Sequence, residues 1–330
     1  MVKTPKKFKM PSFRDNFPPK PQFTESSISS QAGKVFLVTG CSSGVGKELA
    51  KMLYSHNAKV YITARSTKKA EAVIAAIKAA HPESRGELIY LHLDLNDLSS
   101  VKTSADEFLR LENRLDVLWN NAGVMLSPDG MKTKQGYEEQ LGVNCLATFL
   151  FTQLLTPLLI STAKTAAPGF VRVIWISSSA THRSPPGGID FNNLDYKQDI
   201  GKWAKYGTSK AGLYYYATQY AKLHRNDGIV SVSLHPGNLK TELQRNVSSL
   251  QMVVINMMVY PPINGAYTEL FAGLSPEVTL EKSGAWIQPW GRFGSQRPDL
   301  VEGSKSKAEG GTGIAERFWD WSEEQVKPFL

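Results

Sequence analysis

The chain has 330 residues, of which 42% are hydrophobic and 21% charged. This composition excludes a wholly disordered or collagen-like protein and allows a large buried core. Half of the net charge of +8 lies in residues 1–30, which hold six Lys or Arg against two acidic residues, together with five prolines. We therefore predict a basic, solvated tail over residues 1–32.

The same counts limit the partners and the compartment. A basic tail allows association with an anionic membrane, which we do not predict. Nucleic-acid binding is not expected, because the basic residues do not continue into a folded basic face. Cys41 and Cys145 form neither a disulfide framework nor a metal-binding pattern, which fits a cytoplasmic protein without a metal. The longest apolar stretch, residues 250–260, is too short to cross a bilayer.

Apolar runs and helical patterns alternate from residue 34 onward. We expect strands at residues 35–39, 59–64, 88–93, 115–119, 171–176 and 229–234. We expect helices after the glycine-rich loop from residue 46, and at residues 67–80, 99–111, 136–161 and 206–225. Near-continuous apolar strands that alternate with helices predict an α/β fold with a doubly wound parallel sheet.

The domain organisation follows from the lack of an internal linker or repeat. We predict one nucleotide-binding catalytic domain over residues 33–295, with an extension at each end. In the C-terminal extension, residues 296–330, the stretch 301–313 predicts a mobile loop. The aromatic-rich residues 318–330 predict a short docked helix.

A glycine-rich loop joins the first strand to the first helix. Gly40, Gly44 and Gly46 lie in the sequence TGCSSGVG. A strand, a glycine turn and a helix N-terminus place backbone N–H groups and the positive helix end against a pyrophosphate. Gly40 would permit the turn, Gly44 the approach of the ligand, and Gly46 the packing of the helix on the strand. The loop therefore predicts a dinucleotide site.

The glycine spacing, with the motifs that follow it, resembles the short-chain dehydrogenase/reductase family. The matching motifs are NNAG at 120–123, Asn144 in LGVN, Ser178 in WISSSA, YGTSK at 206–210, and Pro236-Gly237 after the sixth strand. The resemblance covers about 33–295, and the sequences of its motifs are most similar to those of the retinol-dehydrogenase-like branch, fungal type. It implies a Rossmann fold and an oxidoreductase, either an alcohol dehydrogenase or a ketoreductase.

The end of the second strand indicates which dinucleotide is bound. Ala64 stands where an NAD enzyme usually carries an acidic residue, so nothing repels a 2′-phosphate. Arg65 can bind that phosphate with two hydrogen bonds, and Ser66 and Lys68 could assist. Within the family, an arginine at this position implies NADP(H). Ser43 stands where some NADP-using members carry a basic residue in the glycine loop.

The resemblance also assigns cofactor contacts along the rest of the chain. Asp94 and Leu95 should border the adenine, Asn121 the adenosine ribose, and Thr241 the nicotinamide end. The complete set of predicted cofactor-binding residues is Gly40, Ser43, Gly44, Val45, Gly46, Arg65, Ser66, Asp94, Leu95, Asn121, Ala122, Gly123, Tyr206, Lys210, Pro236, Gly237 and Thr241.

Tyr206 and Lys210 are predicted to form the acid/base pair. They are four residues apart, on one helix face. Because a tyrosine ordinarily ionises near pH ~10, the Lys210 ammonium would be needed to favour the phenolate. The resemblance implies that Ser178 bonds the substrate oxygen and that Asn144 holds a water in a proton relay through Lys210. Ser178 is preferred over its neighbours Ser177 and Ser179.

The substrate side is predicted to be apolar. Residues 239–262 are rich in Met, Val and Leu and predict an adaptable lid, although a core helix or an oligomer interface would give the same pattern. We expect a lipophilic alcohol or carbonyl compound, retinoid-like, steroid-like or polyketide-type, and the chain could form a homo-oligomer. The alternatives are a non-catalytic dinucleotide-binding scaffold, and an epimerase or dehydratase on the same fold.

Overall fold

The computed structural model describes residues 17–240 and 259–330. Its centre is one eight-stranded sheet with the strand order β3-β2-β1-β4-β5-β6-β7-β8. The strands are β1 (Val35–Val38), β2 (Lys59–Ala64), β3 (Glu87–His92), β4 (Val117–Asn120), β5 (Arg172–Ile176), β6 (Val230–Leu234), β7 (Trp286–Gln288) and β8 (Arg292–Gly294). Neighbouring strands are parallel from β3 to β7, and only the β7–β8 pair is antiparallel.

The strand order reverses between β1 and β4. The chain moves outward from β1 through β2 to β3, and then returns to place β4 on the other side of β1. The two following loops therefore diverge and open a crevice at the carboxyl ends of these strands. All residues of β1, β4, β5 and β6 are buried, as expected for strands covered on both faces.

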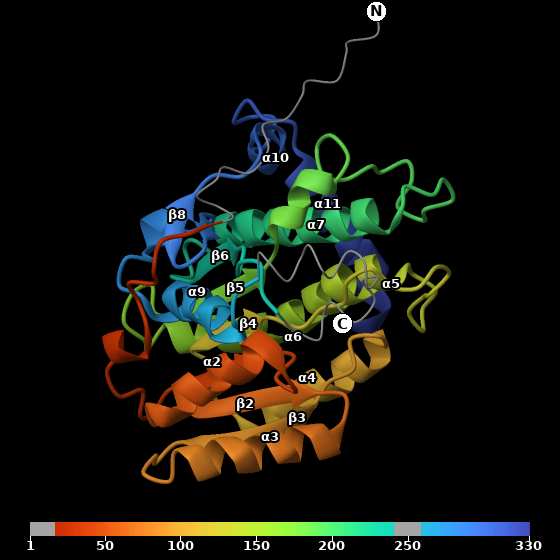
Figure 1. Ribbon diagram of the computed structural model, residues 1–330. Coiled ribbons are helices and arrows are strands. Elements are labelled where there is room, and N and C mark those ends of the chain that lie inside the picture. The colour runs from red at the N-terminus through yellow and green to blue at the C-terminus, as the bar shows by residue number, and fades with distance from the viewer. Residues whose placement is uncertain (1–16, 241–258) are drawn as a thin grey trace, which may run out of the picture.

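Two layers of helices cover the sheet (Figure 1). One face packs against α2 (Gly44–Ser55), α3 (Thr67–Ala80) and α9 (Pro262–Leu274). The other packs against α4 (Leu98–Leu111), α6 (Thr148–Ala163) and α7 (Lys202–Leu223). Each strand thus alternates its side chains between two separate hydrophobic cores.

A continuous helical run leads into α6. It starts with the short α5 (Glu139–Leu141) and passes through a π-helical turn, η2 (Gly142–Ala147). The run over residues 139–163 is the one helix in the described part of the chain that is long and apolar enough to cross a membrane, and most of it is buried inside the protein. It is therefore the central core helix of this face of the sheet.

Both chain extensions contact the domain. Phe23, within the predicted tail of residues 1–32, packs edge-on against Phe271 of α9 with ring centroids 5.8 Å apart. The C-terminal extension forms α10 (Pro298–Ser304) and α11 (Ile314–Val326), and α11 lies along α7 (Figure 1). Phe318 of α11 stacks on Tyr216 of α7 at 5.0 Å.

The predicted α/β fold with a doubly wound parallel sheet is confirmed. The predicted helix over 67–80 and the strand over 59–64 have the bounds found in the structure, and the other predicted strands agree to within two residues at each end. Strands β7 and β8 were not predicted, because three residues are too few to show a period. Residues 301–304, expected in a loop, continue helix α10.

Candidate active site

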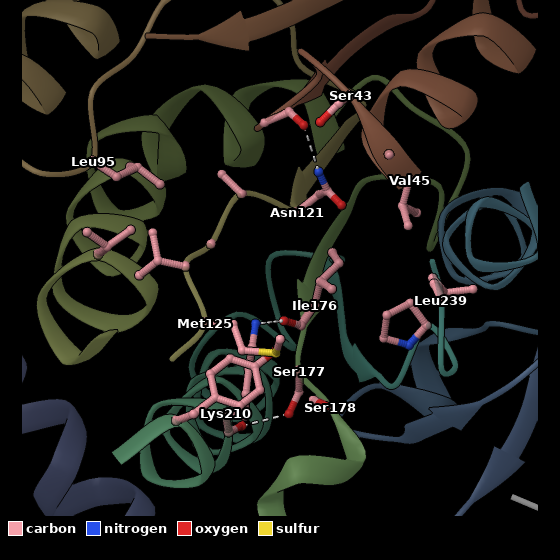
Figure 2. A pocket seen from close by; sticks show the side chains of 18 of the residues that line it. Ser43, Val45, Leu95, Asn121, Met125, Ile176, Ser177, Ser178, Lys210 and Leu239 are labelled. Atoms are coloured by element: carbon pink, nitrogen blue, oxygen red, sulfur yellow. Dashed lines mark hydrogen bonds between the residues drawn. The ribbon is translucent and has the colours of Figure 1, made fainter. Parts of the chain in front are cut away.

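A cavity of about 790 Å³ lies at the carboxyl ends of the parallel strands. Figure 2 shows Ser43 and Val45 of the glycine loop at one end of it, and Ser178 and Lys210 at the other. The predicted site residues that line it are Gly40, Ser43, Gly44, Val45, Arg65, Ser66, Asp94, Leu95, Asn121, Ala122, Gly123, Ser178, Tyr206, Lys210, Pro236 and Gly237. The fold therefore brings residues that follow each of the strands β1 to β6, together with residues of α7, into one pocket.

Three predicted site residues do not line this cavity. Gly46 lies in the first turn of α2, behind the loop. Asn144 is fully buried behind the cavity wall. Thr241, the residue predicted at the nicotinamide end, lies outside the described residues.

The glycine loop is held in shape by contacts that require a glycine at position 40. Gly40 has a φ of +75°, and a Cβ placed on it would lie 2.8 Å from the Cα of Ala122. Its N–H donates to Oγ1 of Thr63 at 3.2 Å. Across the crevice, Nδ2 of Asn121 donates to the carbonyl of Thr39 at 2.6 Å and to that of Gly40 at 3.3 Å. Helix α2 then starts at Gly44, beside the cavity, so its positive end faces a position suited to a pyrophosphate.

The ribose end of the cavity is cationic. Arg65 follows the last residue of β2, and Lys69 lines the same region one turn into α3. Lys68, expected to assist, does not line the cavity, whereas Lys69 does. Ser66 caps α3 by accepting from the N–H of Lys69 at 3.4 Å. Lys69 follows Arg65 by four residues, and this spacing is the sequence signal that could have identified it as the second cation at this end of the cavity.

Asp94 and Leu95 form the adjoining wall, just beyond β3. An Oδ1 atom of Asp94 accepts from the N–H of Asn96 at 3.0 Å, which fixes the carboxylate at the edge of the cavity. Leu95 is buried beside it. The glycine cradle, the helix end, the two cations and this carboxylate together fit a nicotinamide dinucleotide.

Tyr206 lies at the opposite end of the cavity, in the first half of α7. Its buried hydroxyl faces the hydroxyl of Ser178. Burial raises the pKa of Tyr206, and the nearby Ser178 hydroxyl lowers it in part. Ser177, by contrast, donates to the carbonyl of Lys210 at 2.6 Å and points its hydroxyl into the protein. Of these two serines, Ser178 is thus the one whose hydroxyl meets Tyr206.

Lys210 lies one helical turn after Tyr206. Its Nζ is 5.6 Å from the centre of the Tyr206 ring and donates to the carbonyl of Ile176 at 2.8 Å (Figure 2). Burial disfavours the charged ammonium and lowers the pKa of Lys210 to about 8. A buried lysine with a lowered pKa beside a tyrosine is an arrangement that tunes proton transfer.

Asn144 joins two parts of the site from within the π-helical turn. Its Oδ1 accepts from the N–H of Val124 at 2.8 Å, and its Nδ2 donates to the carbonyl of Val124 at 3.0 Å. The same Nδ2 donates to Oγ of Ser209 at 3.0 Å. Asn144 therefore ties the strand end after β4 to the catalytic helix, and both of its amide donors are used in this link. π-Helical turns occur frequently at functional sites.

Several cavity residues near Tyr206 lie outside the predicted catalytic and cofactor-binding set, and those within 180–205 belong to a segment that the sequence also predicts to cover the active site. They include Glu139, His182, Arg183, Trp203 and His235. The guanidinium of Arg183 lies 4.5 Å from the centre of the Trp203 ring, and Trp203 packs edge-on against Tyr206 at 6.5 Å. Trp203 precedes Tyr206 by three residues. The helix starts at Lys202, four residues before the predicted start, and this places both side chains on one face.

The predicted lid over 239–262 lies mainly outside the described residues, which end at 240 and resume at 259. The two described ends meet beside the cavity. The N–H of Tyr260 donates to the carbonyl of Asn238 at 2.8 Å, and that of Lys240 to the carbonyl of Tyr260 at 3.0 Å. Leu239 and Val259 both line the cavity.

Similarity to known proteins identifies the family. A family model described as short chain dehydrogenase matches residues 34–192. A short-chain dehydrogenase/reductase of Phomopsis amygdali is 53% identical, over 95% of this chain and 96% of its own length. The chain belongs to the short-chain dehydrogenase/reductase family. Another member, from Emericella nidulans, is 47% identical over 94% of this chain and 98% of its own.

Family membership and the likeness to fungal members, both predicted from the motifs, are confirmed. This family consists of oxidoreductases that bind a nicotinamide dinucleotide and act on small molecules. The resemblance to the retinol-dehydrogenase-like branch stays a prediction.

Solved structures confirm the fold. The RhlG/NADP active-site complex of Pseudomonas aeruginosa has a TM-score of 0.61 and 25% identity, covering 78% of this chain and 95% of that one. The NADPH-bound carbonyl reductase from chicken fatty liver has a TM-score of 0.60 and 23% identity, covering 82% and 100%. The Rossmann-type sheet is therefore shared with proteins whose structures hold NADP or NADPH.

Proposed function

We propose that the protein is an NADP(H)-dependent oxidoreductase that interconverts an alcohol and a carbonyl group on a lipophilic small molecule, with Tyr206 as the acid/base. The observation that carries this proposal is that Ser178, Tyr206 and Lys210 line the same end of a cavity whose other end is formed by the glycine loop, with Nζ of Lys210 5.6 Å from the centre of the Tyr206 ring. The bound cofactor would supply the hydride, and the side chains of the chain would handle the proton.

The dinucleotide would be held by three groups of residues. The glycine loop and the start of α2 would face the pyrophosphate, with Gly40, Ser43, Gly44 and Val45 in contact. Arg65 and Lys69 would bind the 2′-phosphate, because they are the cations that line this part of the cavity. Lys210 would meet the nicotinamide ribose.

The protonation states fit reduction of a carbonyl. Burial keeps the Tyr206 hydroxyl neutral, which is the form that can donate a proton to the developing alkoxide. Ser178, whose hydroxyl faces that of Tyr206, would hold the carbonyl oxygen in reach of that proton. In the reverse direction Tyr206 must first lose its proton, and a charged Lys210 would stabilise the phenolate.

The substrate class follows from the walls near Tyr206. Met125, Val143, Leu239 and Val259 supply apolar surface, and Trp203 an aromatic one. Such walls favour a largely apolar substrate that carries one oxygen function. A cytoplasmic location and a homo-oligomeric state are further proposals, which derive from the composition and the family.

Turnover of a substrate panel tests this function. Purified protein should oxidise NADPH in the presence of at least one lipophilic aldehyde or ketone, or reduce NADP⁺ with the matching alcohol. Tyr206→Phe should bind NADPH with wild-type affinity and lose turnover, because only the transferable proton is removed. Tyr220→Phe is the matched control, since it removes a buried hydroxyl of the same helix that contacts Thr156 instead.

Three outcomes would contradict the proposal. NADPH binding without turnover of any alcohol or carbonyl compound would favour a non-catalytic scaffold. Conversion of a substrate without net change in the cofactor would favour an epimerase or dehydratase. Retention of most of the wild-type kcat in Tyr206→Phe would remove Tyr206 as the acid.

A further inference from the structure

Arg297, in the C-terminal extension, has a buried side chain that is 1% exposed. Its guanidinium binds both carboxylate oxygens of Asp299, at 2.6 and 2.8 Å. It also donates to a series of carbonyl groups in one short segment, those of Thr181 at 3.2 Å, His182 at 3.4 Å, Ser184 at 3.1 Å and Pro185 at 2.8 Å. One side chain thus supplies hydrogen-bond donors to four main-chain carbonyl groups of a single turn.

The neighbours of Arg297 strengthen this attachment. Oδ2 of Asp299 accepts from the N–H of Gly187 at 2.7 Å. Oε1 of Gln296 accepts from the hydroxyl of Thr181 at 3.1 Å. We call Gln296, Arg297 and Asp299 the extension clamp. It holds residues 181–187 through side-chain contacts with both carbonyl and N–H groups.

The clamped segment is part of the active site. It contains η3 (Ser179–Arg183), a 3₁₀ turn that starts directly after Ser178. Oγ of Ser178 accepts from the N–H of Ala180 at 3.1 Å, so the hydroxyl that meets Tyr206 is also the cap of this turn. His182 and Arg183 of the same turn line the cavity.

Helix α7 holds the other side of the turn. At Gly207, the residue after Tyr206, an added Cβ would lie 2.7 Å from both the carbonyl oxygen of Ala180 and the nitrogen of Ser184. The turn is therefore enclosed between the backbone of the catalytic helix and the guanidinium of Arg297. A shift on the Arg297 side would move Ser178 relative to Tyr206.

We propose that Arg297 is a positioning residue, through which the C-terminal extension sets the place of Ser178 and of the cavity wall at His182 and Arg183. An arginine suits this role because its planar guanidinium offers five donors in a fixed arrangement, whereas a lysine offers three around a single atom. This inference rests on the proposed function, in that its effect on catalysis is read from carbonyl turnover.

Arg297→Lys tests the proposal, with Arg172→Lys as the matched control. Arg172 is also buried, at 5% exposure, and also donates to three carbonyls, those of Gly169, Ala272 and Ser275, each at 3.0 Å. It starts β5, whereas Ser178 lies beyond the other end of that strand. Both variants lose buried hydrogen bonds, but only Arg297→Lys disturbs the turn.

The expected results separate positioning from stability. Both variants should have a lower thermal midpoint. Only Arg297→Lys should lower kcat/KM for the carbonyl substrate, by about 10- to 100-fold, because a displacement of about 1 Å in the reacting geometry has that effect. NADPH affinity should stay near the wild-type value. The alkaline side of the pH profile of kcat should shift upward, because a Ser178 hydroxyl that has moved away from Tyr206 lowers the pKa of Tyr206 less.

Hydrogen exchange supplies a readout that does not need turnover. Amides of residues 178–188 should exchange faster in Arg297→Lys and unchanged in Arg172→Lys. Equal losses of kcat/KM in both variants, or a wild-type kcat/KM and exchange rate in Arg297→Lys, would overturn the proposal. If Arg297→Lys does not fold, Asp299→Asn gives the same comparison with a milder change. If the wild type turns over no substrate, the proposed function fails, and the exchange comparison still decides the role of Arg297.

Discussion

The lowered pKa of Lys210 gives a prediction for the protein without cofactor. In an unfolded chain Lys210 has the ordinary lysine pKa of 10.5, and in the folded protein burial lowers that pKa to about 8. Between these two values the unfolded state binds more protons than the folded state, so the free energy of unfolding rises with pH. The difference between the two pKa values corresponds to roughly 3 kcal/mol.

Replacing Lys210 by methionine removes this dependence. The chain keeps a side chain of similar length, and the carbonyl of Ile176 loses one donor, which costs about 1 kcal/mol at every pH. We expect the free energy of unfolding of Lys210→Met minus that of the wild type to decrease by about 3 kcal/mol as pH rises from about 8 to 10.5. Below pH 8 the difference should be constant, because Lys210 is charged in both states.

Urea unfolding of both proteins at closely spaced pH values measures this difference. Groups that do not interact with Lys210 contribute equally to both proteins, so their contributions cancel in the subtraction. The charge of Lys210 also lowers the pKa of the buried Cys145 and Glu269, so their contributions change together with its own. Parallel curves between pH 8 and 10.5 would show that Lys210 has an ordinary pKa, and the argument that it is tuned for proton transfer would fail.

Three further predictions concern other parts of the chain. Arg65→Ala should weaken NADPH binding by about 10- to 150-fold and leave NADH binding nearly unchanged, since a charge-assisted bidentate contact is lost. Ala64→Asp should weaken NADPH binding further. An unaltered NADPH/NADH ratio of kcat/KM would refute the assignment of NADP(H) as the cofactor. Phe318→Ala should lower the free energy of unfolding by about 3–5 kcal/mol, and a wild-type thermal midpoint would show that α11 is not part of the cooperative core. Gly207→Ala should reduce kcat/KM more than cofactor affinity, because its Cβ would lie 2.7 Å from the carbonyl oxygen of Ala180; unchanged kinetics would mean that the turn adapts freely.

The central part of the fold could be predicted because each strand is buried on both faces. In β5, residues 173–176 are all apolar after the buried Arg172, which separates the strand clearly from the amphipathic helices. Strands β7 and β8 have three residues each and give no such signal. Helix α10 likewise begins with a proline and ends in a serine-rich stretch, so only tertiary contacts fix it.

The site was predictable where function requires a particular residue type at a particular place. A glycine at position 40 is required by a positive φ, and the Tyr206–Lys210 pair by helical spacing. The environment of these residues was not predictable. Trp203 and Arg183 reach the cavity only because α7 begins earlier than its polar first turn indicates, and because η3 folds back on it.

The C-terminal extension contributes to the burial of helix α7. The faces of helix α7 differ little in burial between Tyr206 and Tyr216, because every residue of this stretch is buried. Such a helix needs cover on the side away from the sheet, and Phe318 of α11 provides it by stacking on Tyr216. The segment that leads to α11 contains Arg297, which holds the turn after Ser178. The docked extension therefore covers the helix that carries Tyr206 and also holds the turn that follows Ser178. A chain that lacked residues 296–330 would lose both supports together, although every residue that faces the proposed cofactor would still be present.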